Sequence, residues 1–558
     1  MAVLIATNPQ AQHRSAVRSV TTSLLLALTA LWCAYWFLHS RGYWEDDAYI
    51  HLEFARSFAT GHGFAFNGVV VAGDTAPLWV LLLAATHTLI PNWLAAGKLL
   101  TALGALFGLS GTYAFARRLA SSLLSASDAQ VFSAAVVLLV AVNPYTCYWI
   151  FSGMEPIAAA GLACWAVLAA TRASPSAQSF LVACLLTGLG PLLRPEMLLL
   201  AALLLLPLLH QWRRIPTAPG AKAALFVAGL LLLAGPLLLW SLYSLHAFGH
   251  LLPNTNAAKR AGAGQSILLR LLQVYALGLP VFVVALLAGV YGVLRLGSLR
   301  LGIWRSACSA FRDYSRPQLD SPLEDAPDFV SSQDDIVSSR QRVSVFPLAG
   351  WLFLAWAAIT IFFYIANHTY VQSRYVLLTA PGLMAIVLAL ILFVWPRAGR
   401  GLFGCALIWS VAMSIGVVRP FLRNKEINCQ TSRDMALFIR DRIPANAPVA
   451  VYSIGEIAFV SQHPIVDIGG ITRPGAVPYL NAPPGDLLRW ARSQGAQYDI
   501  ADKPPEAGAT SVFTIDAPFV GWTLHASRYS TAASVSLWKL PPSTQAATQA
   551  SNPTSPRP

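Results

Sequence analysis

Long runs of apolar residues, separated by short polar segments, dominate the chain. A membrane-spanning helix needs roughly 17 to 25 mostly apolar residues, and eleven runs meet or approach that length. A further run at residues 77–91 has only roughly 15 residues, a length that predicts a juxtamembrane helix rather than a span. The runs that predict spans are residues 19–39, 94–116, 129–149, 157–171, 179–193, 197–210, 223–246, 271–294, 345–366, 376–395 and 401–418.

Composition favours an all-α polytopic membrane protein and excludes a soluble enzyme. Of the 558 residues, 56% are hydrophobic and 11% are charged, and the mean hydropathy is +0.56, whereas soluble domains are about 25% charged. The net charge is +13. In a membrane protein the positions of the Lys and Arg residues are more informative than their sum, so this charge does not indicate nucleic-acid binding. The seven cysteines lack a CxxC motif and predict neither a disulfide framework nor a zinc site.

The distribution of Lys and Arg predicts the orientation in the cytoplasmic (inner) membrane, because short cytoplasmic loops retain these residues. Eleven spans with a cytoplasmic N-terminus keep most arginine pairs inside, whereas a span at 77–91 would move almost every pair outside. We therefore predict that the first outer loop, residues 40–93, and the C-terminal segment are extracytoplasmic. Loop 295–344, rich in Ser, Asp and Arg, is interpreted as a disordered cytoplasmic insert.

Residues 421–540 differ in character from the transmembrane domain at 1–420 and predict a small extracytoplasmic α/β domain. A side-chain oxygen and a following acid make Thr431 a candidate helix start. Residues 541–558 lack the apolar residues needed for a core and predict a disordered tail. Within the domain we expect a helix at 486–492 and strands at 449–452, 465–468, 498–501, 511–515 and 534–540.

Three adjacent acids, Glu45, Asp46 and Asp47, follow the first predicted span. Acids placed side by side at a membrane surface repel one another and the anionic headgroups, which favours a functional role. One carboxylate could act as a general base toward an acceptor hydroxyl, or the group could hold a divalent cation such as Mg²⁺ or Mn²⁺ against a phosphate. The alternative is a solvated acidic turn, and the sequence does not identify a metal.

Several cations lie in predicted outer segments, where the positive-inside rule does not favour them. Cations that face the three acids at the membrane surface suit a donor that carries a lipid phosphate, because they would neutralise the negative charge of the phosphate as it leaves. The alternative for each is a salt bridge, for example between Arg194 and Glu155 or Glu196. Histidines such as His51 lack metal-ligand spacing and predict no metal site. The cations considered are Arg56, Arg194, Lys259 and Arg374.

Taken in order, the outer segments resemble the GT-C glycosyltransferases, polytopic enzymes that take a sugar from a polyprenyl phosphate carrier. The branch that they resemble most is the mycobacterial-type terminal arabinofuranosyltransferases. Gly73-Asp74-Thr75 and Asn256-Ala257 depart from the family pattern, which leaves the donor sugar open. The segments that carry the resemblance are Glu45–Ile50, Gly61–Phe64, Gly73–Trp79, Ser152–Glu155, Leu193–Glu196, Leu252–Thr255 with Lys259, Ser373–Tyr375, Ile454–Ala458 and Val466–Gly470.

The resemblance implies that an acid of the first outer loop is catalytic, and Asp46 is favoured over Asp47. The implied partners are a polyprenyl phosphate sugar, with arabinofuranose favoured, a cell-envelope glycan or glycoconjugate acceptor, and membrane lipids. A lipid-linked glycan flippase and a ligase that uses a polyprenyl diphosphate glycan are the alternatives. The residues implied in donor or phosphate binding are Lys259, Arg374, Arg194, Arg56, Asn254 and Tyr49, with Glu45, Glu155 and Glu196 as supporting acids.

Overall fold

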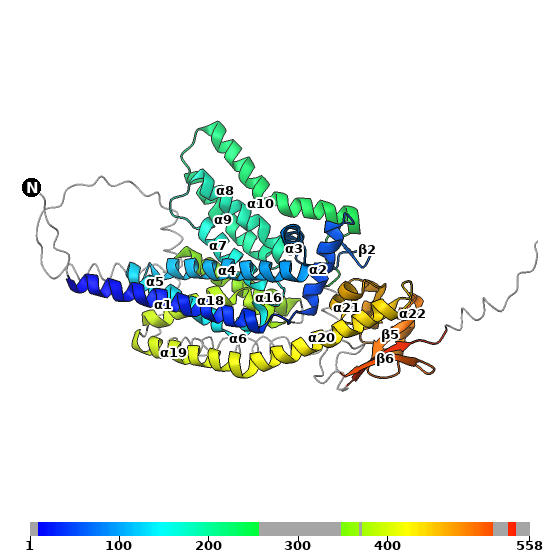
Figure 1. Cartoon of the computed structure of the whole chain (residues 1–558). Coiled ribbons are helices and arrows are strands. Elements are labelled where there is room, and N and C mark those ends of the chain that lie inside the picture. The colour runs from blue at the N-terminus through cyan, green and yellow to red at the C-terminus, as the bar shows by residue number, and fades with distance from the viewer. Residues whose placement is uncertain (1–8, 256–346, 368–370, 395, 517–533, 543–558) are drawn as a thin grey trace, which may run out of the picture.

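A bundle of long helices with a small α/β domain at one end makes up the described part of the chain (Figure 1). The helix α1 begins at the opposite end of the bundle from this domain (Figure 1). Three predicted features, namely the span 271–294, the insert 295–344 and the phosphate-binding Lys259, lie outside the described residues, as does most of the predicted tail. The computed structural model describes residues 9–255, 347–367, 371–394, 396–516 and 534–542.

The helices of the bundle follow the apolar runs of the sequence. Every predicted span other than 271–294 coincides with one helix or with two consecutive helices. Among the described residues, five helical runs are long and apolar enough to cross a membrane, and several apolar helices are shorter. The helices are α1 (Pro9–His39), α4 (Trp93–Ala120), α5 (Ala126–Val142), α6 (Pro144–Trp149), α7 (Pro156–Ala170), α8 (Ala177–Leu193), α9 (Met197–Arg214), α10 (Pro219–Phe248), α16 (Leu348–Ala366), α17 (Ser373–Leu377), α18 (Ala380–Val394) and α19 (Pro396–Met413).

The predicted span 129–149 is broken into two helices, α5 and α6. The break falls at Asn143, because Pro144 has no N–H to continue the helical hydrogen bonds of α5 but suits the first turn of a new helix. The Asn143 side chain accepts hydrogen bonds from the N–H groups of Tyr145 (3.0 Å) and Thr146 (3.4 Å). The apolar run is thus helical on both sides of a break at Asn143, and the break sets α6 against α17.

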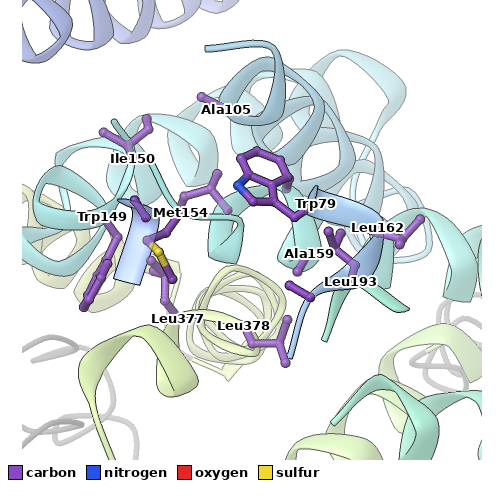
Figure 2. Packing of buried hydrophobic residues seen from close by; sticks show 14 of the residues in the cluster. Trp79, Ala105, Trp149, Ile150, Met154, Ala159, Leu162, Leu193, Leu377 and Leu378 are labelled. Carbon is purple, nitrogen blue, oxygen red and sulfur yellow. The ribbon is translucent and has the colours of Figure 1, made fainter. Parts of the chain in front are cut away.

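Helices α4 and α7 lie close together because glycines face each other at their crossing. A Cβ atom on Gly161 would lie 2.4 Å from the Cα atom of Gly108, so the two backbones have no room for a side chain there. Apolar side chains from many elements fill the core around this crossing, and Figure 2 shows Trp79, Met154 and Leu378 among them. This packing forms the floor beneath the end of the bundle that faces the α/β domain.

A five-stranded sheet, in the order β4-β3-β5-β7-β6, forms the C-terminal domain. Strand β3 pairs in parallel with β4 and β5, whereas β7 pairs antiparallel with β5 and β6. Each predicted strand overlaps one of these strands, and the predicted helix 486–492 lies within α22. The elements are β3 (Val449–Val451), α21 (Ile454–Ser461), β4 (Ile465–Asp467), a 3₁₀ helix (Pro474–Tyr479), α22 (Pro484–Ser493), β5 (Tyr498–Ala501), β6 (Thr510–Asp516) and β7 (Ser534–Lys539).

One uninterrupted helical run connects the bundle to this domain. Helix α19 continues through a π-helical segment (Ser414–Val418) into α20 (Arg419–Arg442). The predicted helix start at Thr431 is wrong, because Thr431 lies inside α20 and its hydroxyl donates to the carbonyl of Ile427, one turn earlier (3.1 Å). Buried residues recur at helical spacing on both sides of Thr431, so one amphipathic face continues past it.

The first long loop lies between the bundle and the α/β domain. Its helix α2 (Asp46–Ala59) packs against both α3 (Pro77–Leu89) and α21. A short antiparallel hairpin of β1 (Ala65–Phe66) and β2 (Val69–Val70) connects α2 to α3. Figure 1 shows α3 end-on, so its axis runs across those of α1 and α4. The loop therefore covers one end of the bundle.

Candidate active site

A pocket that is partly open to solvent lies at this end of the bundle. Its walls come from α2, from the segment before α3, from the turns around α7, α8 and α17, and from residues after α10 and β4. Segments far apart in the sequence thus meet around one space. The charged residues that line it are Asp47, His51, Asp74, Arg194 and Arg374.

Asp47 and Arg374 form an ion pair at the mouth of the pocket. The Asp47 Oδ2 atom lies 2.6 Å from Arg374 Nη2, and the side chain of Asp47 is 34% exposed whereas that of Arg374 is 3% exposed. Burial opposes the charge of Arg374, but Asp47 raises the pKa of this guanidinium well above its ordinary value. The Arg374 guanidinium also lies over the rings of Trp149 (5.5 Å) and Tyr375 (5.4 Å). Asp47 is therefore an accessible carboxylate held by a fixed cation.

Arg194 provides a second buried guanidinium in the pocket. Its Nη1 atom lies 3.2 Å from Glu155 Oε1, and its side chain stacks over Tyr375 at 5.1 Å. Among the described residues, Arg194 Nη2 and Arg374 Nε are buried without a hydrogen-bond partner, and Arg194 Nε makes no hydrogen bond but lies 4.0 Å from Glu196 Oε2. Buried donors without acceptors are costly. An anion that enters the pocket would supply acceptors to these groups.

His51 lies on α2 one turn after Asp47 and links two acids beneath the pocket. Its Nδ1 atom is 2.5 Å from Asp74 Oδ2, and its Nε2 atom is 3.4 Å from Glu155 Oε2. Burial would lower the pKa of His51, but Asp74 and Glu155 raise it to about 10. Burial likewise opposes ionisation of Glu155, but Arg194 and His51 lower its pKa to about 2. His51 is therefore a third cation of the pocket at neutral pH.

The turn that carries Glu155 lies directly against α2 because it contains Gly153. Gly153 has φ +93°, and a Cβ atom there would lie 2.6 Å from the Cβ atom of Ala48. A glycine meets both requirements, since it has no side chain and adopts positive φ readily. The carbonyl of Gly153 also accepts a hydrogen bond from Trp79 Nε1 (3.1 Å), which fastens the turn to α3.

Asp46 faces away from the pocket, toward the α/β domain. Its two carboxylate oxygens accept hydrogen bonds from the N–H groups of Gly455 (3.1 Å) and Glu456 (3.0 Å), in the first turn of α21. Burial raises the pKa of Asp46 to about 7, although both N–H groups act in the opposite direction. Asp46 is not among the residues that line the pocket. The two adjacent aspartates therefore have different surroundings.

The structure places the other predicted site residues in three surroundings. Tyr49 and Arg56 lie, like Asp46, between α2 and α21: the Tyr49 hydroxyl accepts from Arg433 (2.8 Å), and Arg56 pairs with Glu53. The Glu45 carboxylate accepts hydrogen bonds from two tyrosines, and Glu196 accepts one from Tyr364 behind Arg194. The Asn254 N–H donates to the carbonyl of Ala72 (2.9 Å), next to the pocket-lining Thr255.

Of the predicted residues that the structure describes, Asp47, Arg194 and Arg374 line the pocket, and Glu155 lies behind them as a partner of Arg194. Two other residues that line the pocket, His51 and Asp74, were not predicted as site residues. A signal for His51 was present, since it lies four residues after Asp47, and residues at that spacing share one helix face. Asp74 carried no comparable signal, because only the folded chain brings it to His51.

The pocket combines an accessible carboxylate with three fixed cations. This arrangement can bind a phosphate through the cations and place a hydroxyl near a base. The two carboxylates that line it, Asp47 and Asp74, each pair with a cation. In the described part of the chain, no cluster of three or more His, Cys, Asp and Glu side chains is arranged to hold a metal ion.

Comparison with solved structures identifies the fold. The crystal structure of ArnT from Cupriavidus metallidurans in the apo state matches with a TM-score of 0.53 and 14% identity, over 93% of this chain and 98% of that chain. ArnT bound to undecaprenyl phosphate gives a TM-score of 0.49, with 12% identity over 93% and 98% of the two chains. The oligosaccharyltransferase of Archaeoglobus fulgidus, in complex with zinc and sulfate, gives 0.41, with 11% identity over 82% and 63%.

The chain therefore shares the fold of apo ArnT along nearly the whole length of both chains. Residues 421–547 match a family described as a domain of unknown function, DUF8728. No curated protein matches the chain. This likeness concerns the fold alone, so the resemblance to the GT-C glycosyltransferases and to their arabinofuranosyltransferase branch stays a prediction.

Proposed function

We propose that this protein is an integral membrane glycosyltransferase that transfers a sugar from a polyprenyl phosphate carrier to a cell-envelope glycan or glycoconjugate, on the outer side of the membrane. The observation that carries the proposal is the pairing of the accessible Asp47 carboxylate with Arg374, in a pocket that the buried Arg194 guanidinium also lines. The fold shared with apo ArnT supports the same class of reaction. The sequence resemblance favours arabinofuranose as the sugar.

In the proposed reaction, an acceptor hydroxyl attacks the anomeric carbon of the lipid-linked sugar. Asp47 takes the hydroxyl proton as the new carbon–oxygen bond forms. The bond from the anomeric carbon to the phosphate oxygen breaks, and polyprenyl phosphate leaves with the bonding electrons. Charge grows on that phosphate, and Arg194, Arg374 and the protonated His51 lie where they can stabilise it.

Asp47 is our choice of base over Asp46, which the sequence favoured. A general base must reach the proton that it removes, and Asp47 lines the pocket with a partly exposed carboxylate. The Asp46 carboxylate instead accepts two backbone hydrogen bonds from α21. Lys259, implied in phosphate binding by the resemblance, stays a prediction because it lies outside the described residues.

The test is a donor panel with purified protein in vesicles that contain a glycan acceptor. Labelled polyprenyl phosphate arabinofuranose, a polyprenyl phosphate hexose and a polyprenyl diphosphate glycan would be offered in parallel, with Asp47→Asn as the inactive control. We expect label to move to the acceptor from a monophosphate donor only. Transfer from the diphosphate donor alone would favour the ligase. Movement of intact donor between leaflets without transfer would favour the flippase.

A further inference from the structure

The contacts of the C-terminal domain converge on the helix that carries Asp47. Helix α21 begins against the first turn of α2, where Asp46 accepts the N–H groups of Gly455 and Glu456. One turn further, the Tyr49 hydroxyl accepts from Arg433, which also pairs with Glu456 (3.3 Å). Figure 1 shows α2 and α21 meeting where the bundle ends. Polar bonds thus fasten one face of α2 to the domain.

Two further contacts fasten the rest of the first loop. Arg56, near the end of α2, donates to the carbonyl of Phe459 (3.0 Å) and lies over its ring (4.7 Å). The side chain of Asn67, between β1 and β2, donates to the carbonyl of His463 (2.7 Å) and accepts from the N–H of Ile465 (2.8 Å). An amide side chain that both donates and accepts in this way pairs with β4 much as a neighbouring strand would.

The domain also closes part of the pocket itself. Ile471, which follows β4, lines the same space as Asp47 and Arg374. A Cβ atom on Gly73, another lining residue, would lie 3.1 Å from the side chain of Thr472. The residues after β4 therefore lie against the segment that carries Asp74. Removing the domain would open one wall of the pocket.

We propose that the C-terminal α/β domain, whose residues match the family of unknown function, is a positioning element of the active site, and that Asp46 is the positioning residue through which it orients Asp47. The inference rests on the proposed function. Consecutive residues of a helix point about 100° apart. With Asp46 fixed to α21, the first turn of α2 cannot rotate, and Asp47 is held toward Arg374. Misplacement of a reacting group by about 1 Å can cost on the order of a hundredfold in rate.

Gly455 offers a way to disturb this contact from the domain side. A Cβ atom on Gly455 would lie 2.0 Å from the backbone oxygen of Asp46, so Gly455→Ala must push α21 away from α2. Gly485, in α22 of the same domain, is a matched control, because a Cβ atom there meets nothing within 4 Å. Asp46→Asn disturbs the contact from the other side, since an amide nitrogen cannot accept the second N–H.

The readouts are kcat and donor KM in the transfer assay, thermal unfolding, and hydrogen exchange of the amides in residues 46–59. We expect Gly455→Ala and Asp46→Asn to lower kcat by roughly tenfold to a hundredfold, with donor KM nearly unchanged and with faster exchange in α2. Gly485→Ala should match the wild type in every readout. A domain that contributed stability alone would lower the unfolding temperature and leave the kcat of the folded protein intact.

Folded Gly455→Ala protein with wild-type kcat and wild-type exchange in α2 would overturn the inference. If Gly455→Ala does not fold, Asn67→Gly replaces it: it removes both hydrogen bonds to β4 and suits the positive φ of that position, +51°. A wild-type protein that transfers no sugar would instead contradict the proposed function, while the exchange measurement still tests the contact. Lost transfer in Asp46→Asn with normal transfer in Asp47→Asn would refute both this inference and the assignment of Asp47 as the base, while leaving sugar transfer itself supported.

Discussion

Replacing Asp47 by asparagine removes the proposed base and almost nothing else. The side chain keeps its size and can still accept a hydrogen bond from Arg374, which lies 2.6 Å away. What is lost is the capacity to take a proton and the negative charge opposite the guanidinium. The variant therefore tests the role of Asp47 in proton transfer without a large change in the structure of the pocket.

The expected effects on kcat and on donor KM differ in size and direction. General base catalysis contributes about 10²- to 10⁴-fold, so kcat should fall by that factor, or roughly 3 to 5 kcal/mol in activation free energy. Donor KM should not rise, because Arg374 loses its carboxylate partner and becomes more available to phosphate. Asp47 is partly exposed, so the cost in unfolding free energy should stay near 1 to 3 kcal/mol, below that of breaking a fully buried pair.

The assay is steady-state transfer from labelled donor, with thermal unfolding followed by tryptophan fluorescence. Asp128→Asn is the matched control: Asp128 is 37% exposed and pairs with Arg18 at 2.9 Å, outside the pocket. It should keep wild-type kcat and KM. If Asp47→Asn kept more than a tenth of the wild-type kcat, the assignment of Asp47 as the base would be refuted.

Three further predictions concern the cations and the packing beneath them. Arg194→Lys keeps a charge near Glu155 but loses the forked donors, so donor KM should rise on the order of tenfold with a smaller change in kcat, as steady-state kinetics would show. The pKa of His51 is raised from 6.5 to about 10 in the folded protein, so its contribution to stability is complete below pH 6.5 and is lost as the pH rises through 10. The difference in unfolding temperature between wild type and His51→Gln should therefore become smaller between pH 6.5 and pH 10. A difference that stays constant over this pH range would contradict the pairing of His51 with Asp74 and Glu155. Gly161→Ala forces α4 and α7 apart and should cost about 1 to 3 kcal/mol in unfolding free energy, whereas Gly404→Ala, whose Cβ atom meets nothing within 4 Å, should be neutral or slightly stabilising in the same denaturation experiment.

Local patterns predicted the elements better than their connections. The strand at residues 498–501 was predicted with the bounds that β5 has, because Tyr498 and Ile500 are aromatic and β-branched residues of the kind that favour strands locally. Thr431, by contrast, looked like a helix start from its side chain alone, and it lies inside α20 because α20 continues a helix that begins in the bundle. Long-range continuity overrode a local capping signal there.

For the candidate site too, local sequence patterns were more informative than contacts between distant segments. The prediction that an acid of the first loop is catalytic came from the family resemblance and agreed with the three adjacent carboxylates, but our choice between Asp46 and Asp47 depends on which face of α2 meets α21. That contact joins residues about 410 positions apart, so nothing near Asp46 in the sequence reports it. His51 was set aside because it lacks metal-ligand spacing, whereas its partners Asp74 and Glu155 are supplied by two other segments.

The length of the unbroken helix from the bundle into the α/β domain affects where the domain lies. The run Arg400–Arg442 has 43 residues, which at 1.5 Å per residue is about 65 Å, roughly twice the hydrocarbon thickness of a bilayer. One residue inserted in its outer part would turn the domain by about 100° about the helix axis. Seven residues would restore its heading to within about 20° but lift it about 10 Å. The number of residues in this helix therefore contributes to both the distance and the orientation of the domain relative to the bundle, in addition to the side-chain contacts between α2 and α21.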